Sequence, residues 1–184
     1  DALVNNAGIS MRGSVLETPF KVQRDVMEVN YFGQVAVTKA LLPFIPDDGV
    51  VIVTSSLQGK IALPYRSAYS ASKHAVQGFF DALRGEERFG LHILTVIAGY
   101  INTDLGSNAV MSGGVSAEAS NAHLKSGLEP EEAARLIARA AERRETEFIM
   151  APMVHRFAVF MRWFWPNLYF YMVHRRALKE RKTE

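Results

Sequence analysis

The sequence predicts an α/β fold in which a doubly wound parallel sheet lies between two layers of helices. Short apolar runs bounded by Gly, Asn or Ser alternate along the chain with longer segments of helical periodicity. Uninterrupted apolar runs of this length are typical of strands buried on both faces. Their alternation with helices is typical of right-handed crossovers between parallel strands, so we expect a three-layer α/β/α arrangement.

The predicted strands are residues 2–4, 50–54, 91–97 and 148–151. The predicted helices are residues 19–42, 67–88 and 130–143. The first of these helices has Thr18 as its expected N-cap and Pro19 in its first turn. The second has apolar side chains at helical spacing, namely Ala71, Ala75, Phe79 and Leu83.

The length of 184 residues suits one α/β domain. Residues 1–4 resemble a strand that has already begun, without an initiator Met or a targeting segment. We therefore expect the chain to start inside a domain, with the first strands of the sheet missing. Residues 1–151 are expected to form this partial domain, and residues 152–184 an aromatic and basic tail.

Composition excludes several classes of function. The balance of 21 basic against 19 acidic residues is too even to indicate a nucleic-acid partner. The absence of cysteine excludes disulfides and thiolate metal sites. The five histidines lack metal-ligand spacing, so no metal site is predicted.

Small and polar residues follow three of the predicted strands. They are the runs at residues 5–8 (Asn-Asn-Ala-Gly), 55–56 (Ser-Ser) and 98–100 (Ala-Gly-Tyr). The carboxyl ends of parallel strands meet at one edge of a sheet, where open α/β sheets bind their ligands. We therefore place the candidate site at this edge.

Tyr69 and Lys73 supply the chemistry that the candidate site needs. Four residues apart on a helix, they lie on one face. An ammonium beside a phenol favours the phenolate, so we expect Lys73 to lower the pKa of Tyr69 and make it a proton carrier. Ser56 can donate a hydrogen bond to an oxygen on which negative charge develops. Each feature alone has an ordinary explanation, because Tyr-x-x-x-Lys occurs by chance and a Ser after a strand is usually a turn residue.

Together with Asn30 and the Asn-Asn-Ala-Gly run, these residues resemble the short-chain dehydrogenase/reductase family from residue 1 to about residue 150. The resemblance implies a Rossmann-like fold and hydride transfer between a nicotinamide cofactor and a carbonyl or alcohol. It implies that Tyr69 donates or accepts the proton, that Lys73 also holds the nicotinamide ribose, and that Ser56 binds the substrate carbonyl. Asn30 would hold a water in the proton relay, and the alternative is an asparagine that marks a kink in its helix or caps it.

The resemblance also assigns cofactor contacts. They are expected at Asn5, Ala7, Gly8, Asn30, Tyr69, Lys73, Gly99, Ile101 and Thr103, and the role of the first three is partly structural. The family usually has Pro-Gly where this chain has Ala98-Gly99, which leaves the register of Thr103 open.

The cofactor is expected to be NAD or NADP, and the resemblance favours NADP. No glycine-rich phosphate-binding turn precedes the first strand, and the residue that would choose between the two cofactors is absent too. We expect the 184-residue chain alone neither to fold stably nor to turn over substrate, since residues 2–4 would form an unprotected sheet edge. The alternative to an enzyme is an inactive form that serves dimerisation or scaffolding.

The substrate is expected to be lipophilic, of the lipid or steroid kind, bound partly by a lid-like loop at residues 104–128. A sugar-nucleotide epimerase also has Tyr-x-x-x-Lys, but Asn30 and the Asn-Asn-Ala-Gly run argue against it. The resemblance further implies a homodimer through the helices at residues 19–42 and 67–88.

Residues 153–173 are dense in aromatic side chains, and basic residues follow them. Arg156, Arg162 and Pro166 interrupt the segment, which therefore does not read as a membrane span. The pattern predicts either a helix that lies in the membrane interface, or a segment that covers the substrate pocket or forms a dimer contact. Similarity to a membrane-associated branch of the family implies an endoplasmic reticulum or peroxisomal location, and otherwise a cytoplasmic one.

Overall fold

A computed structural model describes residues 1–86, 90–111 and 127–180. Its main sheet has four parallel strands in the order β1-β3-β4-β6, formed by Ala2–Asn5, Val50–Ser56, His92–Ala98 and Glu147–Met150. The α/β prediction is confirmed, and each predicted strand is present within two residues of its expected ends.

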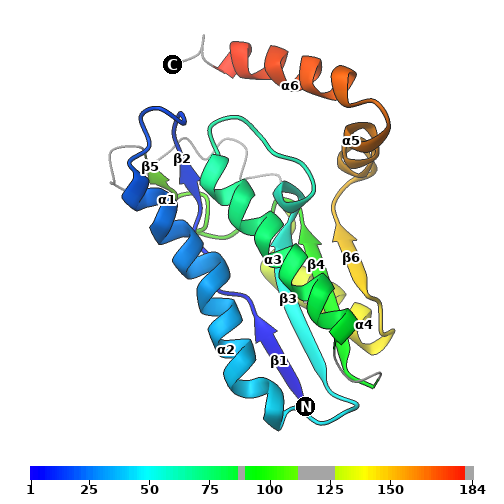
Figure 1. Ribbon diagram of the computed structural model, residues 1–184. Coiled ribbons are helices and arrows are strands. Elements are labelled where there is room, and N and C mark those ends of the chain that lie inside the picture. The colour runs from blue at the N-terminus through cyan, green and yellow to red at the C-terminus, as the bar shows by residue number, and fades with distance from the viewer. Residues whose placement is uncertain (87–89, 112–126, 181–184) are drawn as a thin grey trace.

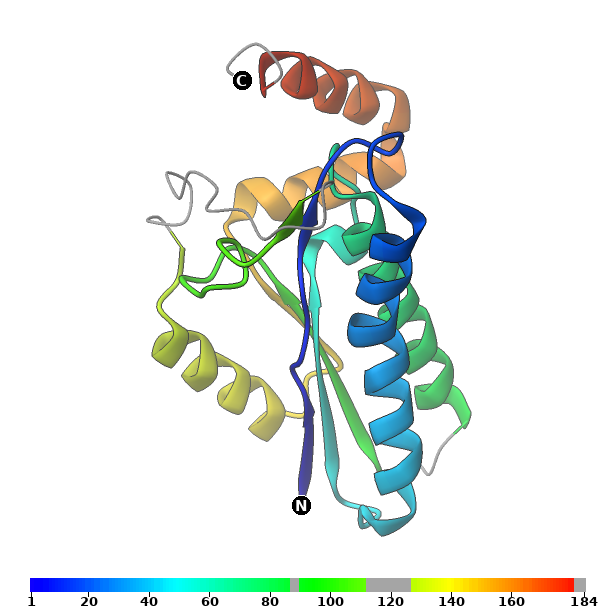
Figure 2. The same ribbon diagram turned by 90° about the vertical axis from the view of Figure 1, so that its left-hand side faces the viewer.

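Helices cover both faces of the sheet, as Figures 1 and 2 show. One face carries α1 (Phe20–Met27), α2 (Gly33–Leu41) and α3 (Ser67–Glu86), and the other carries α4 (Pro130–Glu142). Each face of the sheet has its own hydrophobic core, and successive residues of a strand contribute to opposite cores. Val51 and Val53 pack with Phe80 of α3, whereas Ile52 between them packs with Ala133 of α4.

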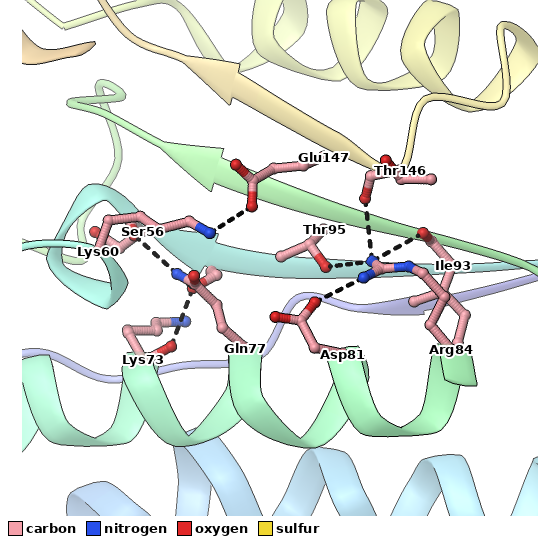
Figure 3. A network of polar contacts seen from close by, with 11 residues as sticks. Ser56, Lys60, Lys73, Gln77, Asp81, Arg84, Ile93, Thr95, Thr146 and Glu147 are labelled. Atoms are coloured by element: carbon pink, nitrogen blue, oxygen red, sulfur yellow. Dashed lines mark hydrogen bonds and ion pairs between the residues drawn. The ribbon is translucent and has the colours of Figure 1, made fainter. Parts of the chain in front are cut away.

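Arg84 fixes α3 to the sheet (Figure 3). Its Nη2 donates to the carbonyl of Ile93 at 3.3 Å, to Oγ1 of Thr95 at 3.2 Å and to the carbonyl of Thr146 at 3.2 Å. Its Nη1 pairs with Asp81 one turn earlier on α3, at 2.6 Å. A single guanidinium therefore joins α3 to β4 and to the residue that precedes β6.

The predicted helix at residues 19–42 is interrupted. A π-helical segment, η1 (Glu28–Phe32), separates α1 from α2, and the N–H of Gly33 donates to the carbonyl of Glu28. The predicted N-cap was wrong as well. Pro19 occupies the cap position, because the Thr18 hydroxyl donates instead to the carbonyl of Ser14 at 2.6 Å.

Several short elements were not predicted from sequence, including a 3₁₀ turn, η2 (Leu42–Phe44), after α2. β2 (Met11–Arg12) and β5 (Val110–Met111) pair as a separate parallel ribbon, and the 3₁₀ turn η3 (Leu57–Gly59) follows β3 directly. β5 lies inside the segment expected to be a loop. Most of that expected lid, residues 112–126, lies outside the described residues.

The C-terminal segment folds as two helices, α5 (Met153–Phe164) and α6 (Pro166–Glu180). Pro166 starts α6 rather than interrupting a single helix, which suits a residue without an N–H. Both views show the pair beyond the carboxyl ends of the strands (Figures 1 and 2). Across the described part of the chain, no helix has both the length and the apolarity to cross a membrane.

Candidate active site

The carboxyl ends of β1, β3 and β4 surround a cavity of about 460 Å³. Among its lining residues are Gly8, Ser56, Tyr69, Lys73, Gly99, Ile101 and Thr103. The sequence placed all seven in one site, and the fold brings them together from β3, α3 and the loops that follow β1 and β4. The structure thereby places Thr103 on the cavity wall.

Ser56 lies at the end of β3, where its hydroxyl oxygen accepts a hydrogen bond from the N–H of Gln58 at 3.1 Å and caps η3. Gln77 of α3 braces this strand end. Its Nε2 donates to Oγ of Ser55 at 2.8 Å and, more weakly, to the Ser56 carbonyl at 3.5 Å (Figure 3). The Ser56 oxygen therefore accepts from the backbone, which leaves its O–H to donate to another oxygen such as that of the Tyr69 phenol.

Lys73 is buried on α3, one turn after Tyr69. Its Nζ donates to the backbone carbonyl of Thr54 at 2.8 Å and lies 5.8 Å from the centre of the Tyr69 ring. Burial disfavours the charged form and lowers the pKa of Lys73 to about 8. The ammonium still predominates at neutral pH.

The pKa of Tyr69 moves in the direction opposite to the sequence-based expectation. Burial removes water from the phenolate and raises the pKa above its ordinary value. A hydrogen bond with Ser56 and the charge of Arg66 oppose this rise without cancelling it. The expectation considered only the Lys73 ammonium, which the fold directs toward Thr54.

Asn30 is fully buried in the π-helical segment. Its Nδ2 donates to the carbonyl of Ile9 and to Oγ of Ser72, both at 2.9 Å, and its Oδ1 accepts from the N–H of Ile9 at 2.7 Å. Ser72 in turn donates to the Tyr69 carbonyl at 2.8 Å. The Asn30 amide thus joins the π segment to the loop after β1 and to α3, as the kink interpretation predicts. The water-holding role stays a prediction.

The residues of the Asn-Asn-Ala-Gly run have two kinds of role, because some stabilise the fold and others line the cavity. Asn5 donates to Oγ1 of Thr38 at 2.9 Å, and the carbonyl of Ala7 accepts from Gln34 at 3.0 Å, so both tie β1 and its loop to α2. Neither residue lines the cavity. Gly8 does line it, and a Cβ there would lie 3.3 Å from Oδ1 of Asn30 and 3.5 Å from Nζ of Lys73.

Sequence reasoning missed several lining residues. Asn6 lines the cavity and accepts a hydrogen bond from Oγ1 of Thr54 at 2.8 Å. Arg12 of β2, Arg66 and Tyr100 also line it. The positions of Asn6 and Tyr100, beside residues already chosen, could have signalled them. Nothing local marks Arg12, because it reaches the site through the unpredicted ribbon.

A second cavity of about 310 Å³ adjoins the first and shares Ser56, Gln58, Ala98, Gly99 and Tyr100 with it. The rest of its wall is mostly apolar and comes from η3, the loop after η3 and the two C-terminal helices: Leu57, Ile61, Leu63, His155, Ala158, Met161, Tyr169, Met172, Val173 and Arg176. The C-terminal segment therefore covers a pocket beside Ser56.

Comparison with known proteins identifies the family. Residues 1–112 match the family model described as short chain dehydrogenase. The chain belongs to the short-chain dehydrogenase/reductase family. Among curated relatives, dehydrogenase/reductase SDR family member 7B is 46% identical in Xenopus tropicalis and 43% in Mus musculus, and SDR family protein 7-like from Drosophila melanogaster is 41% identical.

Each of these matches covers 100% of this chain and 57% to 60% of the relative. The chain thus spans about 60% of the length of the curated relatives it matches. Among solved structures, a short-chain dehydrogenase from Burkholderia cenocepacia in complex with NADP has a TM-score of 0.71 and 26% identity, covering 98% of this chain and 67% of that one. A short-chain dehydrogenase from Streptomyces avermitilis has a TM-score of 0.71 and 25% identity, covering 100% and 72%.

Proposed function

We propose that the protein transfers a hydride between a nicotinamide cofactor and a lipophilic carbonyl or alcohol. The convergence of Ser56, Tyr69 and Lys73 on one cavity, which continues into an apolar cavity beside Ser56, carries the proposal. A volume of about 310 Å³ is at the lower end of the range for small-molecule sites. Its largely apolar wall suits a lipid-like or steroid-like group better than a sugar.

The residues present fit the nicotinamide end of the cofactor. Lys73 supplies a cationic donor for ribose hydroxyls, Gly8 leaves open the space a side chain would fill, and Ile101 lines the same cavity. The bound nicotinamide would supply or accept the hydride. We favour NADP over NAD on the family resemblance, and the related Burkholderia structure contains NADP.

Ser56 and Tyr69 perform the proton chemistry in this proposal. The Ser56 hydroxyl donates a hydrogen bond to the substrate oxygen, because its own oxygen is already engaged by the N–H of Gln58. In reduction, Tyr69 gives its proton to that oxygen while the carbonyl carbon gains the hydride, and in oxidation it takes the proton back. The raised pKa keeps the Tyr69 phenol protonated at neutral pH, which is the form that can give a proton.

Turnover by a protein with the full length of the curated relatives tests this function, because we expect residues 1–184 alone to be inactive. We expect oxidation of NADPH in the presence of long-chain or polycyclic ketones and aldehydes, with weaker use of NADH. The Tyr69→Phe variant should lower kcat by about 10²-fold to 10⁴-fold. Activity confined to small polar sugars would overturn the substrate class.

A second candidate is an inactive form that serves dimerisation or scaffolding. The position of β1 favours it, because within residues 1–86, 90–111 and 127–180 this strand pairs with β3 alone and leaves Val4 exposed at the sheet edge. Calorimetric titration with NADPH separates the two candidates. Saturable binding supports the enzyme, and its absence in a folded sample supports the inactive form.

We also propose a homodimer through α1, α2 and α3, and a membrane-associated location at the endoplasmic reticulum or peroxisome. Exposed Phe32 and Val37 on the first helices, and exposed Ala71 and Gly78 on α3, support the dimer. The exposed aromatic side chains of α5 and α6 support the membrane-associated location. Co-fractionation of the tagged protein with organelle markers tests that location.

A further inference from the structure

Helices α5 and α6 expose a cluster of large apolar side chains, which we call the aromatic surface. It consists of Phe157, Phe160, Trp163, Phe164, Trp165 and Leu168. Trp163 is 73% exposed and Phe164 is 64% exposed. The Phe160 ring lies 4.2 Å from that of Phe164 and 5.7 Å from that of Trp165, between ring centres, so the end of α5 and the residue that joins it to α6 form one patch.

The opposite side of the same two helices already has a partner within the chain. Met161 and Tyr169 pack against Ile61, and the Tyr169 hydroxyl donates to the carbonyl of Ala62 at 3.1 Å. These contacts hold the pair in place without using the aromatic surface. A patch of exposed aromatic rings is costly in water and marks an interaction site.

Charge indicates the kind of partner. Residues 151–179 contain no Asp or Glu, and Arg162 and Arg175 lie over the rings of Phe170 and Tyr171 at 4.8 and 5.8 Å. A second copy of residues 151–179 packed against the first would bring two basic segments together, with no acidic residue in either to pair them. Aromatic rings flanked by arginine are instead typical of helices that lie among the headgroups of anionic lipids.

We propose that the aromatic surface docks on the headgroup layer of an anionic lipid bilayer, with α5 and α6 lying along the membrane rather than across it. Met172 is half-exposed and also lines the second cavity, so this cavity reaches the surface of the helix pair. Docking then places the cavity beside the lipid phase. Delivery of a lipophilic substrate from that phase rests on the proposed function, whereas docking itself does not.

Intrinsic fluorescence tests the proposal directly, because Trp163 and Trp165 are the two tryptophans of the chain. The protein is mixed with vesicles of phosphatidylcholine alone, or of phosphatidylcholine with phosphatidylserine. We expect a blue shift with the anionic vesicles, quenching by lipids brominated near the headgroup, and weaker binding as salt is added. An unchanged emission with both vesicles would overturn docking.

Matched variants locate the contact. Leu168→Asp should weaken binding to the anionic vesicles by about tenfold or more, since an apolar contact is replaced by a charge repelled by the lipid. Arg175→Glu should remove much of the preference for phosphatidylserine. Phe44→Asp is the control, because Phe44 is 80% exposed and lies near the opposite end of the strands, after α2.

Other results of the variant experiments would contradict lipid docking or assign the aromatic surface to another partner. Equal losses with Leu168→Asp and Phe44→Asp would mean that an unfolded chain binds lipid, and would overturn docking by this surface. A dimer in sedimentation that Leu168→Asp dissociates would assign the surface to a second copy. Vesicle binding requires no cofactor, so binding without turnover counts against the oxidoreductase function alone, and turnover without binding counts against docking alone.

Discussion

At the scale of single residues, Ser56 combines a structural and a chemical role. Its oxygen caps η3 by accepting from the N–H of Gln58, and its hydroxyl also interacts with Tyr69. Losing the cap and losing the proton donor are separate effects. Mutation can distinguish them, because stability reports the first and kcat reports the second.

We predict that Ser56→Ala lowers kcat by about 10²-fold to 10³-fold, as expected for loss of one donor to a developing oxyanion. It should also lower the free energy of unfolding by about 1 kcal/mol through loss of the cap. Ser70→Ala is the matched control, because the buried Ser70 hydroxyl donates to Oε1 of Gln58 at 3.2 Å and does not line the cavity. Equal kcat values for the two variants would contradict a catalytic role for Ser56.

The buried ammonium of Lys73 predicts how stability varies with pH. Its pKa is about 8 in the folded protein and near 10.4 when unfolded, so between these values the unfolded chain binds more protons. Stability should therefore rise with pH across this window, by up to about 3 kcal/mol. Denaturant midpoints from pH 7 to 10 measure the rise, and Lys73→Met should flatten it.

Tyr69 acts in the opposite sense at higher pH. Because its folded pKa is raised, the folded protein keeps the phenolic proton above pH 10 while the unfolded chain loses it. Stability should fall there, and Tyr69→Phe should remove the part of the fall due to this residue.

The Lys73 prediction has its own contradicting outcome. If the stability of Lys73→Met rises with pH as steeply as that of the unmodified protein, a group other than Lys73 causes the rise between pH 8 and 10.

The sequence identified Ser56, Tyr69 and Lys73 because spacing on one helix and position after a strand are local properties. It gave the wrong direction for the pKa of Tyr69, because burial depends on what covers the helix. The influence of Arg66 on that phenol was missed for the same reason, since no local pattern orients its side chain.

At the scale of elements, the π-helical segment between α1 and α2 positions the buried Asn30. An additional residue in the turn moves hydrogen bonds from i−4 to i−5, and such segments are frequent at functional sites. From this segment Asn30 reaches both the N–H and the carbonyl of Ile9.

We predict that Asn30→Ala lowers the free energy of unfolding by about 2–4 kcal/mol. The change leaves the N–H and carbonyl of Ile9 without these partners, at about 1–3 kcal/mol for each buried group. Thermal or denaturant unfolding measures the loss. Gln34→Ala serves for comparison, because it removes a single bond to the Ala7 carbonyl and should cost less.

The interruption of this helix was not foreseen as an element. Residues 19–42 have a helical pattern throughout, and a π turn preserves nearly all of it. Asn30 and Gly33 could have indicated the interruption. A polar amide on a buried helix face and a glycine inside a helix are both unfavourable in a regular α-helix. A Cβ at Gly33 would lie 3.3 Å from the Glu28 carbonyl that its N–H binds.

At the scale of the whole molecule, the proposed homodimer predicts the effect of a change on the outer face of α3. A Cβ at Gly78 would meet nothing within 4 Å, so Gly78→Glu should fit the monomer. Glycine is a poor helix former, and the variant should be more stable by about 0.5–1 kcal/mol as a monomer.

The same variant should abolish the dimer, since two like charges would meet across α3 and its copy. Sedimentation velocity on both proteins measures the change in mass. A variant that stays dimeric would place the contact elsewhere, and a protein that is monomeric before the change would remove the proposal.

Short-range periodicity, and the polar residues that interrupt it, were enough to predict the α/β class, the parallel strands and the edge of the sheet that carries the chemistry. Tertiary structure decided what depends on contacts between distant segments. It set the pKa directions of Tyr69 and Lys73 through burial, joined β2 to β5, and folded the C-terminal segment into two helices over a second cavity. Desolvation and packing depend on which distant segments come into contact, and local sequence patterns do not contain that information.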